Sequence, residues 1–105
     1  MEDLQKYSVR VSEDAKRMLN AHTAFLAQVS EDAAQRLVDS FILAADSLKS
    51  MPERCPWFSA EYVPRYLYRY LLFMERYAII FQVEATEVYV EYVIDLRQDY
   101  SWLFR

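Results

Sequence analysis

Three runs rich in aromatic and β-branched residues fill the second half of the chain, and very short connections separate them. The runs read YLYRYLLF over 66–73, YAIIFQV over 77–83 and VYVEYVI over 88–94. Three residues separate the first two runs, and four separate the last two. Runs of this composition predict β-strands, and connections this short join antiparallel neighbours. The second half therefore predicts an antiparallel meander of three strands.

The first half carries one short strand pattern followed by two helix patterns. Residues 6–11, KYSVRV, alternate in polarity as a strand does. Ser12 and Ser30 are each followed by two acidic residues, which is a helix start signal. Apolar residues then recur every three or four positions, and Pro52 requires the second helix to end near Met51. Two helices joined at Ser30 predict an antiparallel helical hairpin.

Together these patterns predict an α+β fold in two layers. The expected order is strand, helix, helix and a three-stranded antiparallel sheet, with the helical hairpin on one sheet face. A length of 105 residues, of which 54% are apolar, suits a single domain over residues 1–105.

Composition excludes several classes of function. The chain has no glycine, so it cannot form the glycine-rich loops of P-loop and dinucleotide-binding proteins. Cys55 is the only cysteine and His22 the only histidine, which excludes a disulfide framework and a Cys/His zinc site. We therefore expect neither a metal nor a cofactor. The net charge of −4 argues against a general grip on nucleic acid, which requires a basic surface.

The sequence also indicates where the protein resides. No apolar run approaches the ~20 residues of a membrane-spanning helix. The N-terminal stretch MEDLQKYSVR lacks the apolar segment of a secretory signal. We therefore expect a cytoplasmic protein with no membrane partner.

The ordered set of motifs resembles the toxins of the RelE/ParE superfamily, the toxic halves of type II toxin–antitoxin pairs. The resemblance covers residues 6–104, through YSVRVSEDA, LKSMPERCPWF, YLYRYLLFMERYAIIFQV and VYVEYVIDLRQDY. It implies this fold, a ParE-like or plasmid stabilisation function, and an antitoxin protein as partner. A homo-oligomer and a complex with the antitoxin both remain open. One branch of the superfamily consists of ribosome-dependent messenger RNA endonucleases, and the other of DNA gyrase poisons.

The resemblance also supplies candidate catalytic residues for the ribonuclease branch. Such an enzyme needs cationic side chains on the scissile phosphate and groups that move protons. Arg69 and Arg97 match arginines of the family pattern, and Tyr100 stands near its late tyrosine. Ala78, however, occupies a position that is often arginine, and Asp95 one that is often histidine. The incomplete set favours gyrase as the target over RNA cleavage, with a non-toxic binding remnant of the family as a third alternative.

Each prominent residue also has a structural interpretation. Arg69 and Arg97 can pair with neighbouring acids such as Asp95, Asp99 or Glu91 at the rim of the sheet, where ion pairs contribute only ~0–1 kcal/mol. His22 lies on the apolar face of its helix, which favours a core role, and Cys55 has no obvious base or acid beside it.

The aromatic residues have two interpretations as well. Tyr66, Tyr68 and Tyr70 alternate along one strand, where packing is favoured over the stacking of nucleic-acid bases. The apolar tail Trp102-Leu103-Phe104 either folds back onto the domain or anchors another chain.

Overall fold

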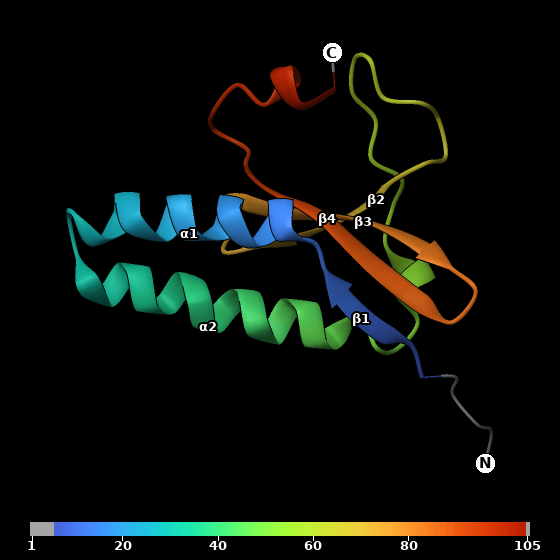
Figure 1. Cartoon of the computed structure of the whole chain (residues 1–105), viewed down its shortest axis with the longest axis horizontal. Helices are drawn as coiled ribbons and strands as arrows, with labels where there is room; N and C mark the ends of the chain where they lie inside the picture. The colour runs from blue at the N-terminus through green and yellow to red at the C-terminus, as the bar shows by residue number, and fades with distance from the viewer. Residues whose placement is uncertain (1–5, 105) are drawn as a thin grey trace.

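The structure is a computed structural model that describes residues 6–104. In chain order its elements are β1 (Ser8–Val11), α1 (Glu13–Ala27), α2 (Glu31–Ser47), the 3-10 turn η1 (Pro52–Arg54), β2 (Arg69–Phe73), β3 (Tyr77–Glu84), β4 (Glu87–Asp95) and the 3-10 turn η2 (Ser101–Phe104). The two helices form a hairpin beside the sheet (Figure 1). Within it, α1 contacts β4 and α2 contacts β2. Within the described residues, no helix has both the length and the apolar character that a bilayer crossing requires.

Both helices begin at the predicted serines. The Ser12 hydroxyl accepts a hydrogen bond from the Ala15 amide at 3.0 Å, and the Ser30 hydroxyl accepts one from the Ala33 amide at 3.1 Å. These bonds satisfy amides that have no partner within the helix. The second helix ends at Ser47, five residues before Pro52, and α1 and α2 pack against each other, so the helical hairpin is confirmed.

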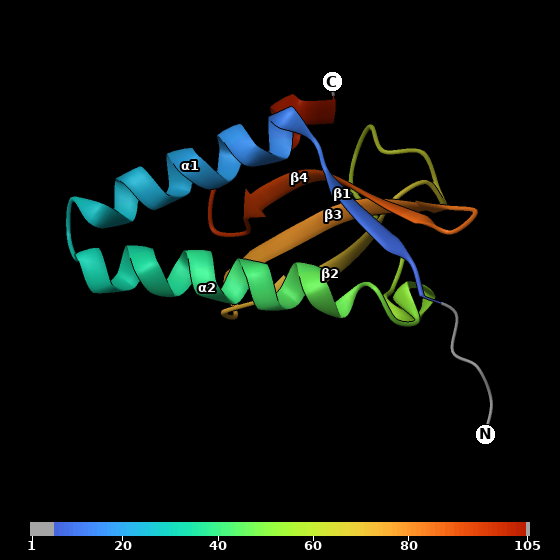
Figure 2. The same cartoon turned by 60° about the horizontal axis from the view of Figure 1, so that its bottom comes forward.

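The α+β class is confirmed, but the prediction of a three-stranded, fully antiparallel sheet is wrong. The sheet has four strands in the order β1-β4-β3-β2, and β1 joins it as the parallel neighbour of β4 (Figure 2). The other pairs, β2 with β3 and β3 with β4, are antiparallel as predicted. Parallel neighbours need a long crossover connection, and the helical hairpin together with β2 and β3 separates β1 from β4 along the chain.

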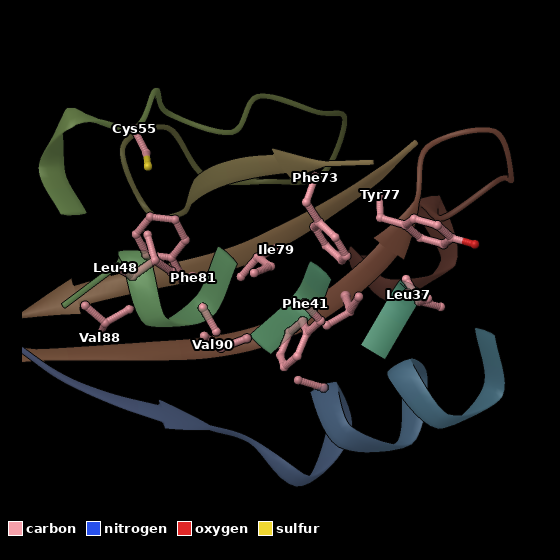
Figure 3. Close-up of a cluster of buried hydrophobic side chains, with 13 residues drawn as sticks. Leu37, Phe41, Leu48, Cys55, Phe73, Tyr77, Ile79, Phe81, Val88 and Val90 are labelled. Carbon is pink, nitrogen blue, oxygen red and sulfur yellow. The ribbon is translucent and has the colours of Figure 1, made fainter. Parts of the chain in front are cut away.

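The main core lies between the helices and one sheet face. Leu37 and Phe41 of α2, and Leu48 directly after it, point toward the sheet residues Phe73, Ile79 and Phe81 (Figure 3). Ala15 of α1 and Val88, Val90 and Val93 of β4 complete this layer. All of these side chains are buried, so this layer supplies most of the apolar burial that stabilises the domain.

A second core covers the opposite sheet face. Its buried members are Phe58, Ala78, Ile80 and Ile94. Partly buried side chains from the loop and the tail pack around them: Ala60, Val63, Tyr68, Tyr70, Tyr92, Tyr100, Leu103 and Phe104. In Figure 1 the loop before β2 and the C-terminal tail both lie on the side of the sheet away from α2. The tail residues Leu103 and Phe104 thus fold back onto the sheet, while the side chain of Trp102 lies outside the described part.

Tight turns in this glycine-free chain place other residues in the left-handed region of backbone space. Positive φ angles occur at Met51, Tyr62, Tyr66, Met74, Glu75 and Ala85 among the described residues. Ala85 and Thr86 form the two-residue loop between β3 and β4, and φ is 54° at Ala85. A positive φ at the first central residue is the pattern of a type II′ turn, where glycine is favoured. Each such residue costs roughly 1 kcal/mol that glycine would not.

Replacing Ala85 with glycine should therefore stabilise the protein. We expect Ala85→Gly to raise the free energy of unfolding by roughly 0.5–1 kcal/mol, because the strain at positive φ is removed. The matched control is Ala24→Gly on the exposed side of the last turn of α1, which should lower the free energy of unfolding by up to about 1 kcal/mol. Urea unfolding of both variants measures whether their free energies of unfolding change in opposite directions. A destabilised Ala85→Gly protein would contradict the turn assignment.

Candidate functional site

A hollow lies at the end of the sheet where β3 begins and β4 ends, against the side of α1. Its volume is about 350 Å³, and its lining residues are Arg17, Met18, Ala21, His22, Phe25, Arg76, Tyr77, Asp95 and Gln98. The lining is mostly apolar, with arginines at the rim. Phe25 is 55% exposed at its edge, so an apolar surface continues outward from the hollow.

A buried ion pair closes one wall of this hollow. Asp95 is 3% exposed, and its Oδ2 accepts hydrogen bonds from Nη2 and Nε of Arg76 at 2.8 and 3.0 Å. Its Oδ1 accepts one from the Arg97 amide at 3.0 Å. Burial raises the pKa of Asp95, but the bonds from Arg76 and from the Arg97 amide outweigh burial, so the pKa is lowered overall. The carboxylate that sequence reasoning left without a definite partner is thus neutralised by Arg76.

His22 and Tyr77 form the floor beside this ion pair. The His22 Nε2 lies 2.9 Å from the Val93 carbonyl oxygen, and since a carbonyl only accepts, this nitrogen donates. The His22 ring lies 5.5 Å from that of Tyr77. Burial raises the pKa of Tyr77, although the Arg76 charge opposes this. Both rings therefore hold fixed positions in the lining of the hollow, and His22 uses Nε2 as a hydrogen-bond donor within the fold.

Two of the three candidate catalytic residues, Arg69 and Arg97, lie at different ends of the sheet. Arg69 stacks on Trp57, with its Cζ 3.8 Å from the ring centroid, and donates to the Cys55 carbonyl at 2.7 Å. Arg97 is exposed just after β4, at the opposite end of the sheet. Arg69 is level with Phe81 and the end of β4 with Tyr77, a separation of about 13 Å along the strand. Tyr100 packs against Phe58 at 6.0 Å between ring centroids.

The sheet face away from the helices is apolar where the ribonuclease pattern requires cations. Ala78 is 0% exposed and lies in the second core beneath the aromatic side chains. Tyr68 and Tyr70 of the predicted tyrosine stripe also belong to this core, whereas Tyr66 is 67% exposed. Burial and the neighbouring Tyr92 raise the pKa of Tyr68 to about 12, so its hydroxyl stays protonated. This face is therefore a packed layer of rings and aliphatic side chains.

Sequence reasoning missed Arg76 and Trp57. Arg76 directly precedes β3, and the pairing of Tyr77 with Asp95 brings it beside that carboxylate. The pairing of β3 with β4, counted from their short loop, would have indicated this contact. However, β4 has a β-bulge opposite Ile80 and Phe81, and the bulge shifts the register by one residue. Trp57 bridges to Arg69 across an isolated pair outside the main strands, for which the sequence has no local signal.

Replacing Asp95 with asparagine tests the buried ion pair. Near neutral pH we expect Asp95→Asn to lower the free energy of unfolding by about 2 kcal/mol, because Arg76 loses its charged acceptor. The folded-state pKa of Asp95 is lowered, so this contribution is complete above the unfolded value of ~3.9 and is lost as pH falls through the folded pKa.

Urea unfolding at neutral and at acidic pH checks this expectation. The difference between wild type and variant should shrink as the solution is acidified. Glu87→Gln, which removes the exposed partner of Arg10, should have a much smaller effect at either pH. A difference of the same size at both pH values would show that the charge of Asp95 is not what matters.

Comparisons with known proteins agree with this architecture. A family model described as the ParE toxin of the type II toxin–antitoxin system parDE matches residues 9–100. A solved chain from the chromosomal ParDE TA system of P. aeruginosa has a TM-score of 0.71 at 16% identity, over 88% of this chain and 98% of that one. Identity at this level supports the shared fold alone. No curated protein sequence matches the chain. Because the family model spans most of its length, the chain belongs to the ParE family of type II toxin–antitoxin toxins, and the resemblance to RelE/ParE toxins is confirmed.

Proposed function

We propose that the chain is a growth-inhibiting cytoplasmic toxin that a protein antitoxin neutralises, and that its target is DNA gyrase. The choice of gyrase rests on one observation: the sheet face away from the helices is covered. A phosphodiester needs convergent cations for cleavage, whereas Ala78, Ile80 and Ile94 fill this face under an aromatic cover. A toxin that acts by binding its target has no such need.

The contacts of Arg76 and Arg69 also favour gyrase as the target over RNA cleavage. Arg76 is bound to Asp95, and Arg69 uses its Nη1 donor on the carbonyls of Glu53 and Cys55. These contacts hold both guanidinium groups in place within the fold. The ribonuclease alternative, with Arg69, Arg97 and Tyr100, would have to bring Arg69 and Arg97 together from different ends of the sheet.

Growth and two in vitro reactions test this proposal. Induced expression in a bacterial host should arrest growth, and co-expression of the antitoxin from the neighbouring reading frame should relieve the arrest. The purified toxin should inhibit supercoiling by gyrase or trap cleaved plasmid with it. In a coupled translation extract it should leave messenger RNA uncut in the ribosomal A site.

The alternatives give different results in the same assays. Messenger cut in the A site, with the cutting lost in Arg69→Ala, Arg97→Ala or Tyr100→Phe, would establish the ribonuclease function instead. Absence of growth arrest and of either reaction would identify a non-toxic binding member of the family.

We propose further that the hollow beside α1 receives an apolar side chain of the antitoxin. Met18, His22 and Tyr77 form its mostly apolar lining, and Arg17 at its rim favours an acidic neighbour on the partner. A buried apolar anchor with a charged rim is the usual arrangement of a protein interface.

Phe25 at the edge of the hollow provides the test. Phe25→Asp should fold normally because the side chain is largely exposed, and it should weaken antitoxin binding by about tenfold or more. Leu43→Asp on α2, where the leucine is 73% exposed, is the matched control and should bind normally. Isothermal titration with the antitoxin measures both. Equal affinities of Phe25→Asp and wild type would place the antitoxin elsewhere.

A further inference from the structure

A second exposed surface lies at the other end of the sheet, on the segment 55–69 that leads into β2. We propose that it is a docking site for an extended segment of a partner protein that carries an apolar side chain next to a basic one. This proposal goes beyond the toxin function above and does not depend on gyrase or on the hollow beside α1.

The base of this segment is held by hydrogen bonds at several points. The Phe58 amide donates to the Tyr68 carbonyl at 2.7 Å, and the Tyr70 amide donates to the Pro56 carbonyl at 3.1 Å. Phe58 is 6% exposed and anchors the segment in the second core. A surface held this firmly loses little conformational entropy when a partner binds.

The same segment presents three large aromatic side chains to the outside. Trp57 is 41% exposed, Tyr62 60% and Tyr66 67%. The Trp57 and Tyr66 rings meet edge to face with centroids 5.5 Å apart, and the Arg69 guanidinium stacks on Trp57. Tryptophan, tyrosine and arginine are the residues that most often dominate binding energy at protein interfaces.

Trp57 and Tyr66 form a ridge between two hollows. On one side, a hollow of about 180 Å³ has Phe58 and Val63 in its wall and Arg65 at its edge. On the other side, a hollow of about 300 Å³ is lined by Glu53, Glu84, Arg69 and Gln82, among others. The first hollow suits an apolar side chain, and the second is polar.

The charges around the second hollow favour a basic side chain. Neither Glu53 nor Glu84 forms a salt bridge within residues 6–104. Arg69, the cation in the same lining, donates to the neutral carbonyls of Glu53 and Cys55 and keeps its charge, so the hollow has two carboxylates against one guanidinium. Two exposed carboxylates attract a lysine or arginine and repel phosphates, so a protein partner fits this surface better than a nucleic acid.

Backbone strain indicates that the exposed rings contribute something other than stability. Tyr62 and Tyr66 have φ of 70° and 61°, a region that is costly for bulky residues and easier for asparagine or glycine. Rings that are mostly exposed recover little of this cost through packing. Contact with a partner accounts for large side chains in these positions.

A displayed library of linear peptides tests the proposal. Full-length wild-type protein serves as bait, and binders that also bind Tyr66→Asn are removed by subtraction. The selected peptides should combine a lysine or arginine with an aromatic or aliphatic residue. Measured by fluorescence polarisation, their affinity should fall about tenfold in Tyr66→Asn and severalfold in Glu84→Gln. Leu43→Ala, which alters an exposed leucine on α2, should bind as wild type does.

Thermal unfolding separates binding from folding. Tyr62→Asn should raise the midpoint by a few degrees because asparagine tolerates positive φ, and Tyr66→Asn should stay within a few degrees of wild type. A large drop in either variant would assign the rings a structural role and overturn the proposal. Failure to select peptides that depend on Tyr66 would overturn it too, as would a labelled single-stranded oligonucleotide whose binding is lost in Tyr66→Asn.

Discussion

Burial of β3 on both of its faces is the constraint on which the rest of the structure depends. Tyr77, Ile79 and Phe81 face the helices, while Ala78 and Ile80 face the loop and the tail. One sheet can bury both faces only if each has a cover. The helical hairpin provides one cover, and the aromatic loop and tail provide the other, so both faces of β3 are covered within residues 6–104.

Hollows open to solvent lie near the two ends of β3. At its start, Arg76 and Asp95 form a buried pair that binds the two strands together beside a hollow. Toward the other end of β3, Trp57 and Arg69 form a stacked pair beside a second, polar hollow. At both places an arginine is held by contacts within the fold. Interaction with other proteins through these two ends agrees with membership of the ParE family.

The sequence predicted those elements whose signals are local. Serine caps, helical spacing and short connections were sufficient for both helices and for the three antiparallel strands. Two long-range features had no such signal. The parallel pairing of β1 depends on how the hairpin crosses the sheet, and the bulge in β4 reverses which residues face the helices. Because of that bulge, Val93 lies on the same face as Val88 and Val90, and Asp95 comes beside Arg76. The site was therefore less predictable than the fold, since one inserted residue decides its composition.

Accessibility of position 78 is the most direct measurement of whether the second face is closed. In a Cys55→Ala background, Ala78→Cys would be reacted with a thiol reagent under native conditions and compared with Ala24→Cys on the exposed side of α1. If the face is closed, the thiol at position 78 reacts only through global unfolding, at least about a thousandfold more slowly than the control. Reaction within about tenfold of the control would show that the face opens in the native state, and would contradict the claim that it is part of the core.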